Sequence, residues 1–189
     1  MAAALFTQSL DSMKRLAIIG SAVNFFDDFI ELVRLKGVMD NMGINDIPCY
    51  FDIQYKHWVS LHPERFQFWK PLCGYRIESD GQEKKLKTTS KVQTHGHEKW
   101  PEVDQVWSFP PGGSSGLFAV RVALALGYQE VYLCGVPMDA TPRFTQTHSP
   151  RKPDYGISEG IQYWEDSLPF LRGRVFSMSG RTKQLLGGI

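Results

Sequence analysis

The sequence lacks the features that would tie the chain to a membrane or to nucleic acid. No apolar run approaches the ~20 residues that a membrane-spanning helix needs. The N-terminal residues lack the basic stretch and long apolar core of a secretory signal. The formal net charge is only +1, so no long-range field would attract nucleic acid. We therefore expect a soluble protein without membrane or nucleic-acid partners.

Cysteine is also scarce. The chain has three cysteines and no C-x-x-C pair, and an odd count argues against a disulfide framework. His95-Gly-His97 has no third residue at a spacing suited to a metal site, so we expect no bound metal and a solvated loop around these histidines. This pattern predicts a reducing compartment, the cytoplasm.

Internal repeats are absent, and 189 residues suit one domain that buries about 70% of its unfolded surface. Short apolar runs typical of buried strands alternate with segments of helical spacing. Strands are predicted at 15–20, 38–44, 57–61, 103–109, 130–135 and 174–178, and helices at 24–36, 64–69, 117–126, 158–171 and 182–186. The alternation predicts an α/β fold, a Rossmann-like three-layer sandwich with a mostly parallel sheet, as a single domain over residues 1–189.

Two stretches do not fit this alternation. Residues 79–100 are polar, rich in lysine and without a sustained period, which predicts a surface loop or hairpin insertion. Residues 137–156 contain four prolines and follow a strand at its carboxyl end. Long loops in that position are often functional, so we interpret 137–156 as an active-site loop.

Two glycine-containing loops lead into helices, where free backbone N–H groups can hold a phosphate. The loop at 20–24 lacks the later glycines of G-x-G-x-x-G, and the loop at 112–116 lacks the Lys of a P-loop. Each is open to two interpretations: a nucleotide site, or a plain turn or helix cap with Ser115 as the N-cap. The candidate nucleotide-binding residues in the two loops are Gly20, Ser21, Asn24, Ser114, Ser115 and Gly116.

Other polar residues follow predicted strands. Asn45 and Asp46 lie at a carboxyl end, where open α/β sheets bind ligands, although an Asx turn before Pro48 is the alternative.

Candidate substrate-binding residues are His62 at a strand end and Asp139 and Arg143 in the proline-rich loop, with a helix cap or solvated charges as the alternative. In the same loop, His148 is a candidate general base near neutral pH.

Residues 114–135 read SSGLFAVRVALALGYQEVYLCG. This string resembles the S/T-S-G segment of bacterial sialyltransferases of glycosyltransferase family 42. It is also similar to the related domain of unknown function 115, which includes archaeal pterin pyrophosphokinases. Weaker matches keep the same order at 16–24, 45–46 and 148–149. Residues 58–64, 135–139 and 177–182 look closer to small sialyltransferase-like proteins of bacteriophages and prophages.

The resemblance implies a metal-independent glycosyltransferase that uses a nucleotide sugar of the CMP type as donor. Gly20, Ser21, Asn45 and residues 114–116 would line the nucleotide site, and His148 would act as base on the acceptor hydroxyl. The phage-type matches imply the cytoplasm of a bacterial host.

The chain departs from the family pattern in its first loop, where G-x-G-P-S-L is replaced by GSAVNF at 20–25. Two alternatives therefore stay open. One is a non-catalytic nucleotide-binding phage protein. The other is a pyrophosphokinase-like phosphoryl transferase, which would need Mg²⁺ and carboxylates, with Asp46 and Asp139 as the available pair.

Overall fold

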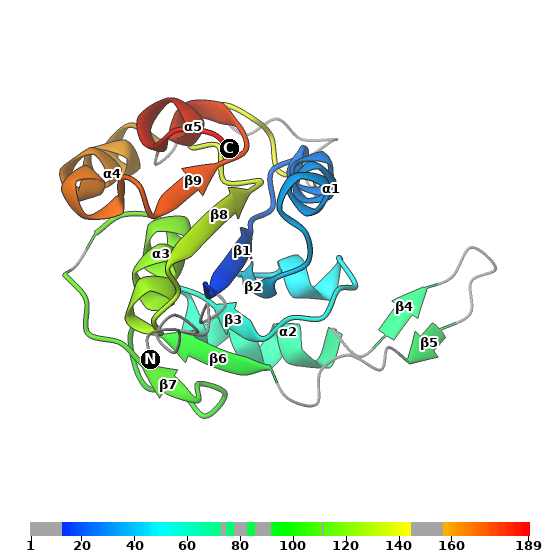
Figure 1. The fold of residues 1–189 in the computed structure, drawn as a ribbon. Helices are drawn as coiled ribbons and strands as arrows, with labels where there is room; N and C mark the ends of the chain where they lie inside the picture. Colours follow the sequence, from blue (N-terminus) through cyan, green and yellow to red (C-terminus); the bar gives the residue numbers. More distant parts are fainter. Residues whose placement is uncertain (1–12, 73–74, 78–82, 86–91, 111, 145–156) are drawn as a thin grey trace, which may run out of the picture.

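One parallel sheet organises the molecule. The computed structural model describes residues 13–72, 75–77, 83–85, 92–110, 112–144 and 157–189. The strands are β1 (Arg15–Ile19), β2 (Asp40–Ile44), β3 (His57–Val59), β6 (Gln93–Gly96), β7 (Gln105–Val106), β8 (Glu130–Cys134) and β9 (Val175–Ser177). Their order is β7-β6-β3-β2-β1-β8-β9, and every neighbouring pair is parallel (Figure 1). The predicted Rossmann-like α/β class is confirmed.

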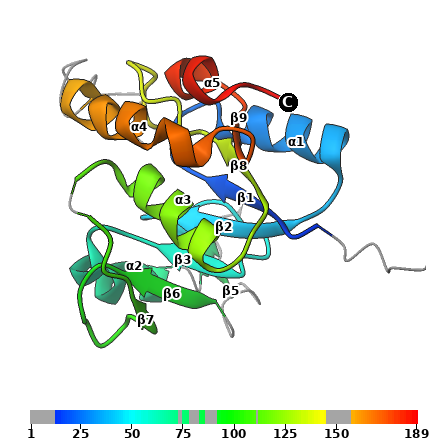
Figure 2. The ribbon, with the colours of Figure 1, turned by 60° about the vertical axis from the view of Figure 1, so that its left-hand side comes forward.

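Helices cover both faces of this sheet. α3 (Ser115–Ala125) and α4 (Ile157–Leu171) share one hydrophobic cluster with the sheet, to which α5 (Gly180–Leu186) adds Leu186. The opposite face is covered by α1 (Phe25–Lys36), by the 3-10 turn η1 (Ile47–Cys49), and by α2 (Phe66–Leu72), which follows η2 (Pro63–Arg65). Figure 2 shows α1 and α3 on opposite sides of the strands.

The central strand β1 shows why the sequence adopts three layers. Leu16 and Ile18 pack in the cluster beside α3, whereas Ala17 and Ile19 face the side of α1, and all four are fully buried. A parallel strand covered on both faces is apolar throughout rather than alternating, as residues 16–19 are.

The expectation for residues 79–100 is correct only in part. β4 (Tyr75–Ile77) and β5 (Glu83–Lys85) form an antiparallel pair, but residues 93–96 are β6 of the main sheet. The predicted loop is wrong there because the polar side chains of Thr94 and His95 in β6 are buried with hydrogen-bond partners. Thr94, for example, is fully buried and its Oγ1 donates to Asp104 Oδ2 at 2.7 Å.

No helix within the described ranges is both long and apolar enough to span a membrane. Of the proline-rich loop, residues 137–144 are described, and 145–156 lie outside the described residues.

Candidate functional site

The strand order reverses between β1 and β8, and the loops that leave these strands meet at the carboxyl edge of the sheet. The Gly20 N–H donates to Cys134 O at 2.8 Å, and the Val23 N–H donates to Pro142 O at 2.8 Å. The Phe144 N–H donates to Ser21 O at 2.9 Å. In open α/β sheets such a reversal is the usual place for a ligand, and here the two loops that border it are also bonded to each other.

Arg143 joins two other predicted site residues, Ser21 and Asp46. Its Nε donates to Ser21 Oγ at 2.8 Å, and its Nη2 lies 3.5 Å from Asp46 Oδ1. The side chains of Arg143 and Asp46 are 32% and 20% exposed. The Arg143 side chain is therefore partly exposed where the strand order reverses. Ser21 in the turn after β1 and Asp46 in the loop after β2 hold its guanidinium.

Asn45 directly follows β2 and has a left-handed conformation with φ of 54°. Its Oδ1 accepts a hydrogen bond from Ser60 Oγ at 2.8 Å, and its carbonyl accepts one from the Trp58 indole. Its Nδ2 has no partner among the described residues, so this amide can donate to a ligand.

Ser60 is a functional candidate that the sequence reasoning missed. The rule that selected Asn45, a polar residue just after a strand, would also have selected Ser60 after β3.

The glycine-rich loop ends in a cap that differs from the one expected. Ser114, not Ser115, is the N-cap of α3, because its Oγ accepts from the Leu117 N–H at 3.3 Å. The same Oγ accepts from Trp164 Nε1 at 3.2 Å. The N–H groups of Ser115 and Gly116 have no partner within the described part of the chain. These two N–H groups are candidate donors at the start of α3.

Packing explains two of the glycines. A Cβ on Gly20 would lie 2.5 Å from the Gly135 carbonyl oxygen and 2.8 Å from Val136 Cγ2. A Cβ on Gly116 would lie 2.7 Å from Val136 Cγ1. Val136 therefore lies against both glycines, so both predicted binding loops approach this buried side chain.

Asn24 contacts a buried carboxylate rather than open space. Its Nδ2 donates to Ser179 Oγ at 2.7 Å, and it precedes α1 without a side-chain capping bond. Asp28 Oδ2 accepts from the Gly135 N–H at 2.9 Å and from Ser179 Oγ at 2.6 Å. These bonds tie the first turn of α1 to the loops after β8 and β9.

The remaining predicted residues do not join Arg143. Asp139 Oδ1 accepts from the backbone N–H and the hydroxyl of Thr141, at 2.9 and 2.5 Å. His62 is exposed, with Nδ1 3.6 Å from Glu64 Oε1. His148 lies outside the described residues. Asp46 and Asp139 thus have different partners in the described part of the chain.

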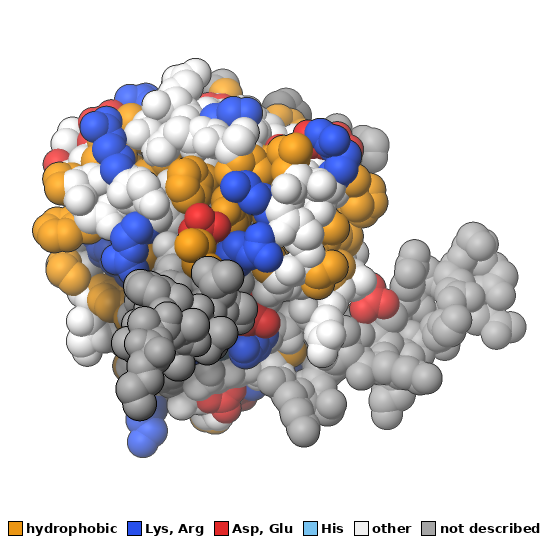
Figure 3. All heavy atoms as spheres, viewed as in Figure 1, with side chains coloured by type: hydrophobic (Ala, Val, Ile, Leu, Met, Phe, Trp, Pro, Cys, Tyr) orange, Lys and Arg blue, Asp and Glu red, His pale blue; other side chains and the backbone are white. Residues whose placement is uncertain are grey.

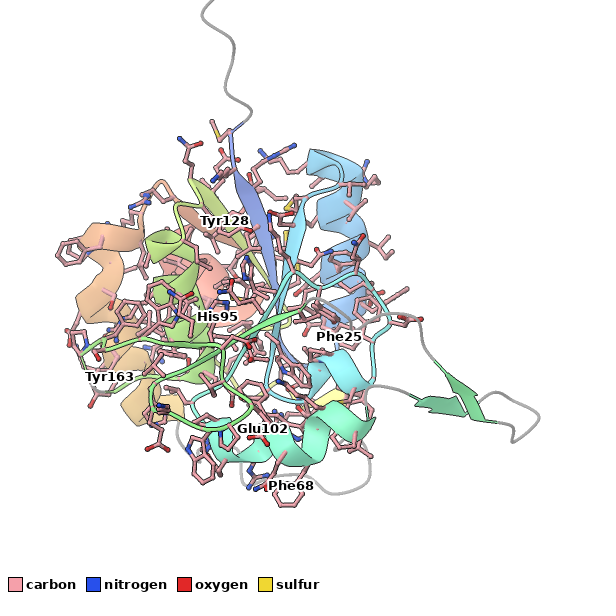
Figure 4. The ribbon with its side chains drawn as sticks, turned by 90° about the horizontal axis from the view of Figure 1, so that it is seen from below. Phe25, Phe68, His95, Glu102, Tyr128 and Tyr163 are labelled. Atoms are coloured by element: carbon pink, nitrogen blue, oxygen red, sulfur yellow. The ribbon has the colours of Figure 1, made fainter. Side chains whose placement is uncertain are left out.

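A second polar group lies inside the molecule, beside the cluster that α3 covers (Figure 4). The Trp107 indole donates to His95 Nδ1 at 3.0 Å, so His95 Nε2 carries the proton and donates to His57 Nδ1, also at 3.0 Å. His57 Nε2 then donates to the Tyr128 hydroxyl at 3.0 Å, which donates to Asp40 at 2.7 Å. The solvated loop expected around His95 is therefore wrong.

Burial dominates the titration of these histidines. It lowers the pKa of His57 and the pKa of His95 to about 4, with Lys56 opposing the charge on His57 and His57 opposing the charge on His95. Both histidines are neutral at pH 7, which matches the single direction of the hydrogen bonds.

Within the described ranges, no group of three or more His, Cys, Asp or Glu side chains is placed to hold a metal ion. Comparison of the chain with protein-family models, with curated proteins and with solved structures finds no match.

Proposed function

We propose that the protein binds a nucleotide-activated sugar at the carboxyl edge of β1, β2 and β8 and transfers the sugar to an acceptor hydroxyl. The observation that carries this proposal is Arg143, which joins Ser21 and Asp46 at the point where the strand order reverses. A partly exposed guanidinium in this position suits a phosphate group, because it offers charge and several N–H donors.

Neighbouring donors extend this site. The Nδ2 of Asn45 and the N–H groups of Ser115 and Gly116, which have no partner among the described residues, can donate to phosphate and sugar oxygens. The positive end of α3 also favours an anion at its first turn. The resemblance of residues 114–135 to the sialyltransferases supports a donor of the CMP type.

For the transfer step, His148 takes the proton from the acceptor hydroxyl while the bond between the sugar and the leaving phosphate breaks. The acceptor oxygen forms the new bond to the sugar, and the nucleotide leaves with the electron pair. This role rests on the position of His148 in the sequence, so it needs a kinetic test.

The His148→Ala variant tests this role. It should lower kcat by roughly 10²–10⁴-fold, because a positioned general base contributes about that much, while donor affinity stays near the wild-type value. Turnover and donor affinity are measured with a CMP-sugar and a panel of hydroxyl acceptors, with His97→Ala as the matched histidine control. Wild-type turnover in His148→Ala would refute the assignment.

A second candidate is a nucleotide-binding protein without catalysis. Asp46, the described carboxylate that contacts Arg143, is paired with the guanidinium and is therefore a poor base for an acceptor hydroxyl. This candidate predicts nucleotide binding with no product from any sugar donor. The same assay therefore separates the two functions.

A further inference from the structure

A fixed aromatic surface adjoins the polar group formed by Arg143, Ser21 and Asp46. Phe144 follows Arg143 in the chain, and Tyr50 follows η1, whose N-terminal cap is Asp46. The rings of Tyr50 and Phe144 lie 5.3 Å apart at 72°. The segment with Asp46 and Tyr50 and the segment with Arg143 and Phe144 are therefore joined twice, by an ion pair and by a contact between aromatic rings.

Several contacts hold these rings in place. Phe144 also packs on Phe25, with ring centroids 5.4 Å apart, and Phe25 packs on Phe51 at 5.0 Å. The Tyr50 N–H donates to Ile47 O at 3.0 Å. Because the rings are ordered before any ligand arrives, a ligand that stacks on them costs little conformational entropy.

Tyr50 remains 56% exposed despite these contacts. Tyr50 lies at the end of η1, and the N-cap of η1 is Asp46, which contacts the Arg143 guanidinium. Tyr50 and Arg143 both belong to loops at the carboxyl edge of the sheet, where open α/β sheets bind ligands. A nucleotide has the matching chemistry, because a base presents a π-face to an aromatic ring and a phosphate pairs with arginine.

We propose that Tyr50 and Phe144 form the base subsite of the nucleotide site. The base stacks on the exposed Tyr50 ring, Phe144 supports that ring from the side, and the phosphate lies toward Arg143. This inference rests on the proposed function and adds the residues that hold the base.

The chain offers a matched control for this subsite. Phe26 belongs to the same group of rings, contacts Phe25 and Phe51, and is 49% exposed, but it lies on α1. Figure 3 shows hydrophobic side chains gathered over α1. Loss of the Phe26 ring removes comparable ring packing without touching the segment that carries Tyr50 and Asp46.

The experiment is a calorimetric titration of CMP, UMP, AMP, GMP and inorganic phosphate into four proteins: wild type, Tyr50→Ala, Tyr50→Phe and Phe26→Ala. Tyr50→Ala should weaken nucleotide binding by about 5–100-fold, the range expected for loss of one base–aromatic stack. Tyr50→Phe and Phe26→Ala should bind nucleotide as the wild type does, and phosphate affinity should be equal in all four. In the wild type, the Tyr50 ring protons should shift upfield when CMP is added, which needs no variant.

Failure of the base subsite and failure of the proposed function give different results in this experiment. Wild-type nucleotide affinity in Tyr50→Ala, with no shift of the Tyr50 ring protons, would overturn the base subsite and leave the proposed function standing. If the folded wild-type protein binds none of the four nucleotides, the proposed function fails and the subsite fails with it.

Discussion

At the scale of single residues, Gly20 shows how a motif residue can have a packing role. In the sequence it suggests a phosphate loop, because it lies between a strand and a helix. In the structure the space that a side chain would need is occupied by the Gly135 carbonyl and Val136. Ligand binding and packing both call for glycine at this position, so the residue alone does not distinguish them.

Gly20→Ala should lower the free energy of unfolding by about 1–3 kcal/mol, the usual cost of an added methyl group in a tightly packed place. The matched control is Gly160→Ala in α4, where the nearest atom is the flexible end of Met138 and alanine favours the helix. Urea unfolding of the two variants measures both effects. Gly20→Ala as stable as the wild type would contradict the packing role.

At the scale of elements, β6 is held to β3 by the chain of hydrogen bonds through His95 and His57. Protonation of His95 would turn Nδ1 into a donor facing the Trp107 N–H, so the bond between them would be lost. The charged neighbours are Lys56, Asp40 and Asp104, of which the two carboxylates favour the protonated histidines. Burial lowers the pKa of each histidine by more than the carboxylates raise it.

The sign of the pH dependence follows from these pKa values. The folded-state pKa of each histidine is about 4, below the ordinary 6.5, so the unfolded chain binds more protons between these values. The stabilising contribution is fully present above about pH 6.5 and is lost as the pH falls toward 4.

His95→Gln should reduce the loss of unfolding free energy between pH 6.5 and 4.5 by about 1–2 kcal/mol. Urea unfolding at both pH values measures it. The control is His62→Gln, which replaces an exposed histidine and should leave the pH dependence unchanged. Identical pH dependence in His95→Gln and the wild type would contradict the role of the buried chain.

The elements that could be predicted from the sequence are those whose buried residues are apolar. β1, α3 and β8 are continuous apolar segments, and all three form where expected. β6 could not be predicted, because its buried Thr94 and His95 have hydrogen-bond partners distant in the sequence. Tyr50 was missed for a related reason: its pairing with Phe144 depends on how two distant loops meet.

At the scale of the whole molecule, the predicted order of strands and helices determines which loops lie at the carboxyl edge of the sheet. Polar residues that follow parallel strands must lie at one edge of the sheet, and Ser21, Asp46 and Arg143 meet there. Which side chains touch was not predictable. Asn24 turns toward Ser179 and Asp139 bonds to Thr141, because short polar side chains take the nearest partners in the folded loops.

The most direct test of a nucleotide site at this edge is thermal unfolding of the wild type and of Asn45→Ala with CMP, UMP, AMP, GMP and their sugar conjugates. A ligand at 100 times its Kd should stabilise the wild type by about 2.7 kcal/mol and raise Tm by a few degrees. We predict such a shift with one class of nucleotide, and a smaller shift in Asn45→Ala, which loses the amide donor. An unchanged Tm of the wild type with every ligand would contradict the proposed site.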